Sequence, residues 1–365
     1  MLKTLSIRNF RNLDISDLQL GSGVTIVVGG NGQGKTNLIE AVYLLSYGKP
    51  FHGTRSEAIN WNESNAEIFG ETSKGSIRIF LYREGETKII INNKTKPATY
   101  LLGRLATVLF HPGEIELIGG PPAARRVWLD KLIATINRGY LFNLINYNKT
   151  LINRNKLLKI SGGNATEEQL ETWDRLLAKY GIKLWQEREK EISSLNRILN
   201  KISKGTIGKN ARIEYTVPIN LESEGLSKKE FLRALKNKRG VERRLIMTTF
   251  GPHRDDLKLV VEEELGQSIL EKDLGPFGSR AEKRQAIILL NLAQAQLFSR
   301  IFGEPPVILL DDVTSELDEK NRGLLLTHIS ARQILITTTS LDLLTAEFKK
   351  RARVLNMVDG KIIEP

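Results

Sequence analysis

The first 110 residues alternate apolar and polar side chains over short stretches that turn-forming residues separate. A period of two places the apolar side chains on one face of a strand, so this pattern predicts a strand-rich region. Asn92 and Asn93 suit a tight hairpin turn, because asparagine tolerates the left-handed backbone that such turns need. The predicted strands cover residues 2–8, 24–28, 66–69, 77–83 and 87–91.

A helical region follows the break at residues 119–122, where two glycines precede two prolines. Apolar residues then recur every three or four positions, which is the spacing that a packed helix needs. Thr166-x-x-Gln169 and Ser227-x-x-Glu230 match the capping box that opens a helix, and residues 212–217 predict a strand. The two apolar stripes are Trp128, Leu132, Ile133, Ile136, Leu141, Leu144 and Ile145, and Leu170, Trp173, Leu176, Leu177, Tyr180, Leu184 and Trp185.

Strands and helices alternate again from Leu257 onward, after Gly251 and Pro252 end the helical section. Consecutive apolar residues at 306–310 are typical of a parallel strand that is covered on both faces. We therefore predict an α/β core made of residues 1–115 and 250–365. A mainly helical lobe at residues 116–249 interrupts it, and the absence of sustained heptads argues against a long coiled coil.

The turn after the strand at 24–28 fits G-x-x-x-x-G-K-[ST], the P-loop that holds nucleotide phosphates. Its glycines let successive N–H groups converge on an anion, and the following helix adds its positive dipole end. We expect Lys35 to reach the β- and γ-phosphates and the Thr36 hydroxyl to ligate Mg²⁺. A Gly-rich surface loop is the alternative, which the strand–turn–helix context disfavours. The loop residues are Gly29, Gly30, Asn31, Gly32, Gln33, Gly34, Lys35 and Thr36.

Two carboxylates, Asp311 and Asp312, end the buried strand at 306–310. Ligands bind α/β sheets at the carboxyl ends of their strands, so this pair is placed to complete the nucleotide site. We expect Asp311 to hold Mg²⁺ and Asp312 to polarise the attacking water. A helix cap is the alternative function for one of the two carboxylates, but it does not account for both.

Composition excludes several classes of site. The chain has 365 residues, 41% of them hydrophobic and 26% charged, and it has no cysteine. Disulfides, thiolate catalysis and cysteine-based zinc sites are therefore excluded, in keeping with a reducing compartment. The N-terminus lacks the apolar core of a signal peptide, and no apolar run is long enough for a membrane span. We expect a cytoplasmic protein without a membrane partner.

The positive charge is concentrated in the middle of the chain. The formal net charge is +12, and residues 121–250 hold 26 Lys and Arg against 13 Asp and Glu. Such a segregated surplus favours a surface that binds nucleic acid, with solvated helix faces as the alternative. We expect the exposed cations to include Lys236, Lys238, Arg239, Arg243 and Arg244.

Ser279-Arg280-Ala281-Glu282 opens a predicted helix from Arg280 to about Ile301. Ser-x-x-Glu is a capping box, which suffices as a structural explanation. A helix N-terminus with a hydroxyl is also an anion site, and the γ-phosphate held by a second subunit is a candidate anion.

Taken together, these motifs resemble the RecF family, bacterial recombination mediators of the SMC/ABC-type ATPase group. The resemblance covers essentially the full length of the chain. The residues that carry it are 7–13, Gly29 to Asn37, Phe110-His111-Pro112, Gly120-Pro121-Pro122, Arg125-Arg126, Gly251 to Asp256, Leu309 to Val313 and Ser315 to Asp318.

The resemblance implies an ABC/SMC-type ATPase head whose two subunits sandwich two ATP molecules. Each P-loop, including Asn37, faces Ser279 of the other subunit, Ser315 to Asp318 contact across the interface, and Arg8 lies near the nucleotide. The ATP-bound homodimer clamps double-stranded and gapped DNA and works with RecO and RecR to load recombinase. Slow, DNA-stimulated hydrolysis then opens the dimer.

Some positions depart from the family pattern. The usual signature reads Ser-Gln-Gly-Gln, so Ala281 removes close backbone approach and Glu282 adds negative charge. The switch histidine is replaced within Thr337-Thr338-Thr339, where strand register favours Thr338, and His111 is a candidate for the Q-loop position. A transporter-type ABC ATPase and an ATP-binding module without turnover are the competing functions.

Overall fold

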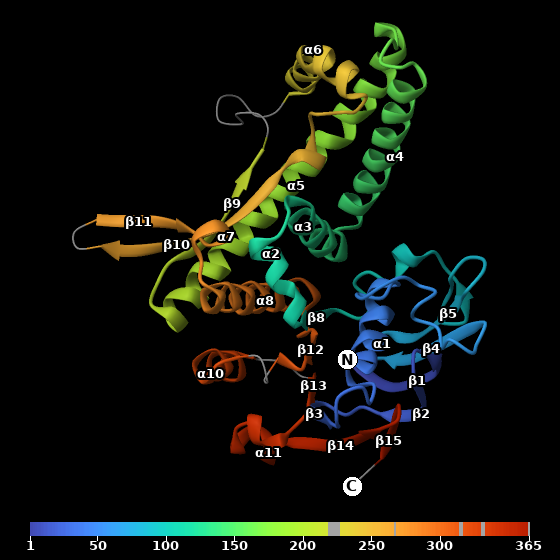
Figure 1. Ribbon diagram of the computed structural model, residues 1–365, viewed down its shortest axis with the longest axis vertical. Coiled ribbons are helices and arrows are strands. Elements are labelled where there is room, and N and C mark those ends of the chain that lie inside the picture. The colour runs from blue at the N-terminus through green and yellow to red at the C-terminus, as the bar shows by residue number, and fades with distance from the viewer. Residues whose placement is uncertain (218–226, 266–267, 314–316, 330–332, 364–365) are drawn as a thin grey trace. The chain divides into compact units, whose positions relative to one another are not determined.

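The computed structural model describes residues 1–217, 227–265, 268–313, 317–329 and 333–363 (Figure 1). It divides into two compact units: unit 1 is Met1–Ile115 with Arg284–Pro365, and unit 2 is Glu116–Lys283. The inserted lobe, predicted to end at residue 249, extends in this division to residue 283. The reason is that the strands after residue 255 pair with a strand of the lobe.

Unit 1 contains an antiparallel sheet with the order β2-β1-β4-β5-β6-β7. Five of its strands correspond to predicted segments or to the hairpin after Asn92 and Asn93, which have φ of 49° and 64°. Strand β2 lies outside the predicted set, because a bulge at Asp17, with φ of 50°, breaks its alternation. The strands are β1 (Leu2–Phe10), β2 (Leu13–Gln19), β4 (Asn65–Thr72), β5 (Gly75–Tyr82), β6 (Lys88–Ile91) and β7 (Lys94–Thr95).

The second sheet of unit 1 has the order β15-β14-β3-β13-β12-β8, and all of its pairs are parallel except β14 with β15. Strands β12 and β13 are buried along their whole length, and for β12 the continuous apolar run at 306–310 predicts this. The strands are β3 (Gly23–Val28), β8 (Thr107–Phe110), β12 (Val307–Asp311), β13 (Gln333–Thr338), β14 (Ala352–Val358) and β15 (Lys361–Ile363).

Helix α1 (Lys35–Tyr47) is the central element of unit 1, and it contacts β1 and β4 of one sheet and β12 and β13 of the other (Figure 1). Its buried Leu38, Val42 and Leu45 join the apolar residues of both sheets in one core. The position of α1 is therefore fixed from two sides. Among the described residues of unit 1, the other helices with given bounds are η1 (Ala98–Tyr100), η2 (Pro112–Ile115), α10 (Glu319–His328), η4 (Leu341–Leu343) and α11 (Ala346–Lys350), and α8 (Arg280–Phe302) begins in unit 2.

Unit 2 combines long helices with a small antiparallel sheet of order β11-β10-β9. The capping boxes at Thr166 and Ser227 are confirmed at the starts of α5 and α6. Asn196 of α5 hydrogen-bonds both backbone groups of Ile213, which satisfies the outer edge of β9. The elements are α2 (Glu116–Gly119), α3 (Pro122–Ile136), α4 (Arg138–Ile160), α5 (Glu167–Ile207), β9 (Ala211–Thr216), α6 (Lys228–Leu245), η3 (Pro252–Arg254), β10 (Asp256–Leu265), β11 (Ser268–Asp273) and α7 (Leu274–Phe277).

A buried ionic network ties these helices to the segment before β10. The Arg188 guanidinium donates to Asp255 at 2.6 Å, to Asp130 at 2.7 Å and to the Pro252 carbonyl at 2.7 Å. The Asp255 carboxylate also accepts hydrogen bonds from Trp185 and Tyr215. Because these buried charges satisfy one another, removing one partner leaves an unpaired charge in the core.

Arg125 and Arg126 extend this network from α3. Arg125 forms two hydrogen bonds to the Asp256 carboxylate, at 2.7 and 3.0 Å, and Arg126 donates to the Asp255 carbonyl at 2.7 Å. The two arginines and the Gly251–Asp256 segment, which lie far apart in sequence, thus form one structural junction.

His253 makes the stability of unit 2 dependent on pH. Its Nε2 lies 3.1 Å from the Thr248 carbonyl and therefore donates, so its Nδ1 accepts from the Tyr147 hydroxyl at 2.7 Å. Burial lowers the pKa of His253 to about 4, from 6.5 for a free side chain. Between these values the unfolded chain binds a proton that the folded chain does not.

We therefore expect the free energy of unfolding to fall as pH drops from about 6.5 to about 4, by up to about 3 kcal/mol from His253 alone. Substituting His253→Gln removes this contribution, so the variant should lose less stability between pH 7 and pH 5. Urea unfolding followed by circular dichroism measures both proteins at each pH. Equal losses in the two proteins would contradict the assignment.

Candidate nucleotide-binding site

The P-loop lies between β3 and α1, as the strand–turn–helix pattern predicts. Gly32 and Gly34 have φ of 79° and 104°, a backbone region that favours glycine. A Cβ on Gly34 would lie 2.8 Å from Asn12 and Leu13, and one on Gly29 would lie 2.5 Å from the Met357 carbonyl. Gly34 is therefore required by both its backbone conformation and its close packing, Gly32 by its backbone conformation and Gly29 by its close packing.

Lys35 is held inside the loop that it belongs to. Its side chain is buried, and its ammonium group donates to the carbonyls of Gly29 and Gly30 at 2.8 Å each. These bonds direct the charge into the loop at the first residue of α1, where the helix N–H groups also point. A cation and a helix N-terminus at one place fit a bound phosphate group.

The carboxyl end of β12 meets the first turn of α1. Asp311 Oδ1 accepts hydrogen bonds from the Thr36 hydroxyl at 2.9 Å and from the Thr337 hydroxyl at 3.0 Å. Burial raises the pKa of Asp311, while these two hydrogen bonds act in the opposite direction. A hydroxyl and a carboxylate oxygen in contact are a donor set that fits Mg²⁺, which prefers oxygen ligands and completes its shell with water and substrate phosphates. Within the described ranges, no group of three or more His, Asp or Glu side chains is arranged as a protein-only metal site.

Asp312 follows directly and has an unusual backbone. Its φ is 48°, in the left-handed region that non-glycine residues rarely adopt, and its N–H donates to Thr337 Oγ1 at 3.1 Å. Thr337 thus contacts both carboxylate residues. Thr338, which strand register favours as the replacement of the switch histidine, lies on the opposite face of the strand and donates to the Ser340 carbonyl. Its function as the switch residue stays a prediction.

His111 lies beside the same carboxylate, with its Nε2 3.9 Å from Asp311 Oδ2. Its ring contacts those of His52 and Phe51, at centroid distances of 4.5 and 5.2 Å. Burial, followed by the neighbouring His52, lowers the pKa of His111 to about 4. A neutral ring therefore borders Asp311 at neutral pH.

Some of the contacts that support the loop join residues far apart in sequence, and the sequence pattern does not predict them. Asn12 donates to the Gly32 carbonyl and accepts from Asn37, and the Gln33 carbonyl accepts from the Gly360 N–H at 3.0 Å. Asn12 follows a bulge in which Asn9 and Arg11 have positive φ. The asparagines near positive-φ positions offered a weak signal, but their partners are distant in sequence.

Arg8 lies on the exposed side of β1. It lines an open cavity of about 390 Å³, whose charged residues also include Asp14, Asp17, Glu67 and Arg78. Its expected contact with a nucleotide stays a prediction.

Ser279 lies in unit 2 and forms the capping box that its sequence predicts. Its N–H donates to Glu282 Oε2 at 2.8 Å, and the Glu282 N–H donates to the Ser279 hydroxyl at 3.3 Å. Lys272 donates to Glu282 at 2.8 Å, and this contact, followed by the Ser279 N–H, lowers the pKa of Glu282 to about 2. The charge of Glu282 is therefore offset locally.

The expected interface segment Ser315 to Asp318 is only partly covered, because Ser315 and Glu316 lie outside the described residues. Asp318 caps α10 by accepting from the Asn321 N–H at 2.8 Å. Among the helices described, none combines the length and apolar character needed to cross a bilayer.

Comparison with known proteins identifies the family. The family model for the RecF/RecN/SMC N terminal domain matches residues 1–362. A DNA replication and repair protein RecF from Thermoanaerobacter sp. (strain X514) is 35% identical over 353 residues, which cover 94% of this chain and 95% of the relative. A protein of the same name from Clostridium botulinum (strain ATCC 19397 / Type A) is 33% identical over 368 residues, 99% of each chain.

Solved structures agree with this family. The recombination mediator protein RecF-ATP of the RecFOR pathway superposes with a TM-score of 0.89 at 31% identity, over 100% of this chain and 97% of that chain. An SMC head bound to the C-winged helix domain of ScpA has a TM-score of 0.53 at 16% identity, which supports the shared head fold alone. The chain has the α/β head fold of this ATPase group with an inserted helical lobe, and it belongs to the RecF family.

Proposed function

We propose that this chain is an ATP-dependent DNA-binding protein of recombinational repair and replication, in which ATP and Mg²⁺ drive two copies to close on duplex or gapped DNA. The observation that carries the proposal is the contact of Thr36 with Asp311, beside the enclosed Lys35 ammonium. Membership of the RecF family supports the repair function, and a relative of this fold is described as RecF-ATP.

Different residues of unit 1 bind the phosphates and the metal. The N–H groups of Gly30 to Thr36 and the Lys35 ammonium bind the phosphates, while the Thr36 hydroxyl and Asp311 hold the metal. When bound, Mg²⁺ supplies charge stabilisation to the phosphate oxygens. Thr337 keeps Asp311 oriented, because it donates to the oxygen that also accepts from Thr36.

Asp312 is the proposed base for hydrolysis. Its left-handed backbone is held by the hydrogen bond from its N–H to Thr337. Strained backbone held by its surroundings is a frequent feature of catalytic residues. We propose that Asp312 orients and deprotonates the attacking water and that turnover is slow.

A second subunit completes the site in the proposed dimer. By resemblance, the Ser279 hydroxyl of one copy contacts the γ-phosphate held by the other, and Arg8 and the Ser315 to Asp318 segment act near the interface. The pairing of Glu282 with Lys272 supports this role, because it offsets the negative charge next to Ser279. The atypical Ala281 and Glu282 are therefore compatible with a weakly stimulated ATPase.

The basic lobe is the proposed DNA surface. Arg239 and Arg243 are engaged with Asp174 and Glu167, so they serve the fold. The exposed cations of α6 instead include Lys229, Arg233 and Lys236, which share one helical face at i, i+4 and i+7. We further propose that RecO and RecR are partners, that the ATP-bound dimer assists recombinase loading and that the protein acts in the cytoplasm.

Substituting Lys35→Met should abolish nucleotide binding at micromolar concentrations. Loss of a charged hydrogen-bond donor costs about 2–3 kcal/mol, which raises the dissociation constant for ATP roughly 100-fold. Titration calorimetry with Mg-ATP measures this constant, and unchanged affinity would remove Lys35 from the site.

Asp312→Asn should keep ATP binding and lose hydrolysis. Removing a general base lowers turnover by roughly 100-fold or more, whereas the isosteric amide preserves the local packing. Phosphate release measures turnover, with ATP affinity as the control. Wild-type turnover in this variant would exclude Asp312 as the base.

Nucleotide should control association with DNA. Light scattering is expected to report a monomer with ADP and a dimer with ATP, and gel shifts should show duplex and gapped DNA bound more tightly with ATP. A monomer with both nucleotides would contradict the proposed ATP-driven dimer. Equal DNA affinity with ATP and with ADP would contradict the proposed control of DNA binding by nucleotide.

Charge reversal at Lys229, Arg233 and Lys236 should reduce the dependence of DNA affinity on salt. Each lost phosphate contact lowers the slope of log K against log salt by about 0.9. Fluorescence anisotropy at several salt concentrations measures the slope. An unchanged slope would relocate the DNA surface away from α6.

A further inference from the structure

One end of unit 2 carries exposed aliphatic side chains that come from two contacting segments, the C-terminal half of α4 and the C-terminal end of α6 (Figure 1). The Thr248 N–H and hydroxyl both donate to Asn155 Oδ1, at 2.8 and 2.7 Å, which holds the segments together. We call the exposed set the tip surface: Ile152, Ile160, Val241, Leu245, Ile246 and Met247, between 37% and 76% exposed.

Ile246 has an unfavourable backbone for its residue type. It ends α6 with φ of 55° and ψ of 34°, in the left-handed region that usually selects glycine at a helix end. A β-branched side chain is disfavoured there because its Cβ approaches the backbone. Its side chain is 40% exposed, so burial does not explain the choice.

Hydrogen bonds to Glu242 hold the turn around Ile246 in place. The N–H groups of Ile246 and Met247 both donate to the Glu242 carbonyl. The buried Glu242 carboxylate accepts from Arg154 at 2.7 Å and from the Thr249 N–H at 2.8 Å. The exposed apolar side chains are therefore presented on a fixed support, which lowers the entropy cost of binding a partner.

The tip surface is surrounded by positive charge. Residues 131–166 contain no Asp or Glu, and Glu242, the single carboxylate in residues 231–247, is buried. At the start of α5, Glu167 contacts Arg243 and Glu171 contacts Arg175, while Glu168 is exposed. The exposed cations on the two segments are Lys149, Lys156, Lys159, Lys238 and Arg244.

We propose that the tip surface is a docking site for an acidic amphipathic helix of a partner protein. An apolar stripe at i, i+3, i+4 and i+7 would cover the aliphatic side chains, while flanking Asp and Glu would meet the surrounding Lys and Arg. Charge complementarity sets the orientation and speeds association, and the buried aliphatic contacts supply affinity.

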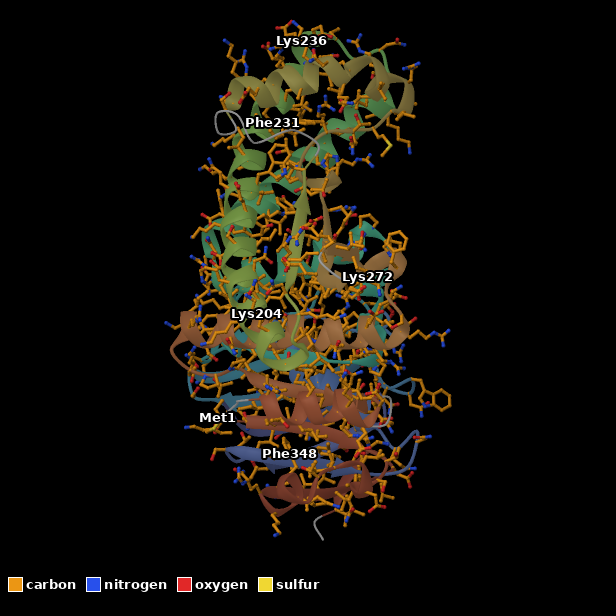
Figure 2. All side chains as sticks on the ribbon, turned by 90° about the vertical axis from the view of Figure 1, so that its left-hand side faces the viewer. Met1, Lys204, Phe231, Lys236, Lys272 and Phe348 are labelled. Carbon is orange, nitrogen blue, oxygen red and sulfur yellow. The ribbon has the colours of Figure 1, made fainter. Side chains whose placement is uncertain are left out.

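DNA fits this surface less well than a protein does. Aliphatic side chains gain little from a phosphate backbone, and single strands are bound by aromatic rings, which the tip surface lacks. The cations proposed for DNA, Lys229, Arg233 and Lys236, lie on another face of α6 from Val241 and Leu245, which are separated by one turn. Figure 2 shows the side chains around Lys236 and Phe231 at this end of the unit. The docking site does not depend on nucleotide, so it is testable apart from the clamp.

The test selects peptides from a display library of helices of about 18 residues, using the full chain as bait and the Ile152→Asp/Leu245→Asp double variant for counter-selection. Both positions are exposed, so the substitutions should leave folding intact, which circular dichroism verifies. Ile269→Asp on β11 is the matched control, because Ile269 is 64% exposed and lies outside the tip surface.

We expect selected peptides to carry an apolar stripe flanked by Asp and Glu. Their affinity for the double variant should be roughly tenfold weaker than for the wild type, and Ile269→Asp should change nothing. Peptides without this pattern, or equal affinity for the wild type and the double variant, would overturn the proposal. The proposal would also be overturned if the double variant bound a DNA duplex or phosphatidylglycerol vesicles more weakly but bound the peptides with unchanged affinity.

Ile246→Gly separates binding from folding. Relief of the left-handed strain should raise the urea midpoint of unfolding, while loss of the side chain should weaken the selected peptides severalfold. A lower midpoint would mean that Ile246 serves the fold, and unchanged peptide affinity would remove it from the docking site.

Discussion

The register of three parallel strands is the constraint on which the nucleotide site depends. Strand β13 pairs with β3 on one side and β12 on the other, so Thr337 lies opposite both Val27 and Asp311. The carboxyl ends of the three strands therefore reach the same edge, where α1 begins. A shift of one residue in β12 would turn the Asp311 side chain to the opposite face of the sheet, away from Thr36. The core that packs α1 between the two sheets thus also maintains the contact between Thr36 and Asp311.

Local signals explain why so much of this arrangement was predictable. A continuous apolar run that ends in two carboxylates identified β12, and the glycine pattern identified the P-loop, because each motif needs its neighbours in sequence. The contacts of Asn12 with Gly32 and of Gln33 with Gly360 were not predictable in this way. They depend on bulges and turns whose partners meet only after the sheets have formed. Whether Thr337 or Thr338 contacts Asp311 likewise depends on the sheet face to which each side chain points. The sequence alone does not predict that face.

The boundary of the inserted lobe illustrates the same limit. Alternation after Leu257 predicted strands correctly, but the pattern could not tell which sheet they join. Strand β10 pairs with β9, and Asp255 accepts hydrogen bonds from Trp185 and Arg188 of α5, so the segment belongs to unit 2. In the sequence, a carboxylate at the start of a strand that binds a metal cannot be distinguished from one that pairs with an arginine. Only the surrounding cations decide between a binding site and a structural junction.

Two residues with a left-handed backbone lie at sites for which a function is proposed, one at the nucleotide site and one on the tip surface. Asp312 and Ile246 both have φ near 50°, a conformation that glycine adopts at lower cost. At Asp312 the backbone N–H is held by Thr337 beside Asp311, so the proposed function as a base would account for the strain. At Ile246 the side chain is aliphatic and exposed, and the nearby Asn155, Arg154 and Glu242 already satisfy the turn without it. We therefore explain the strain at Ile246 by the proposed binding of a partner protein, which does not require a nucleotide in the P-loop.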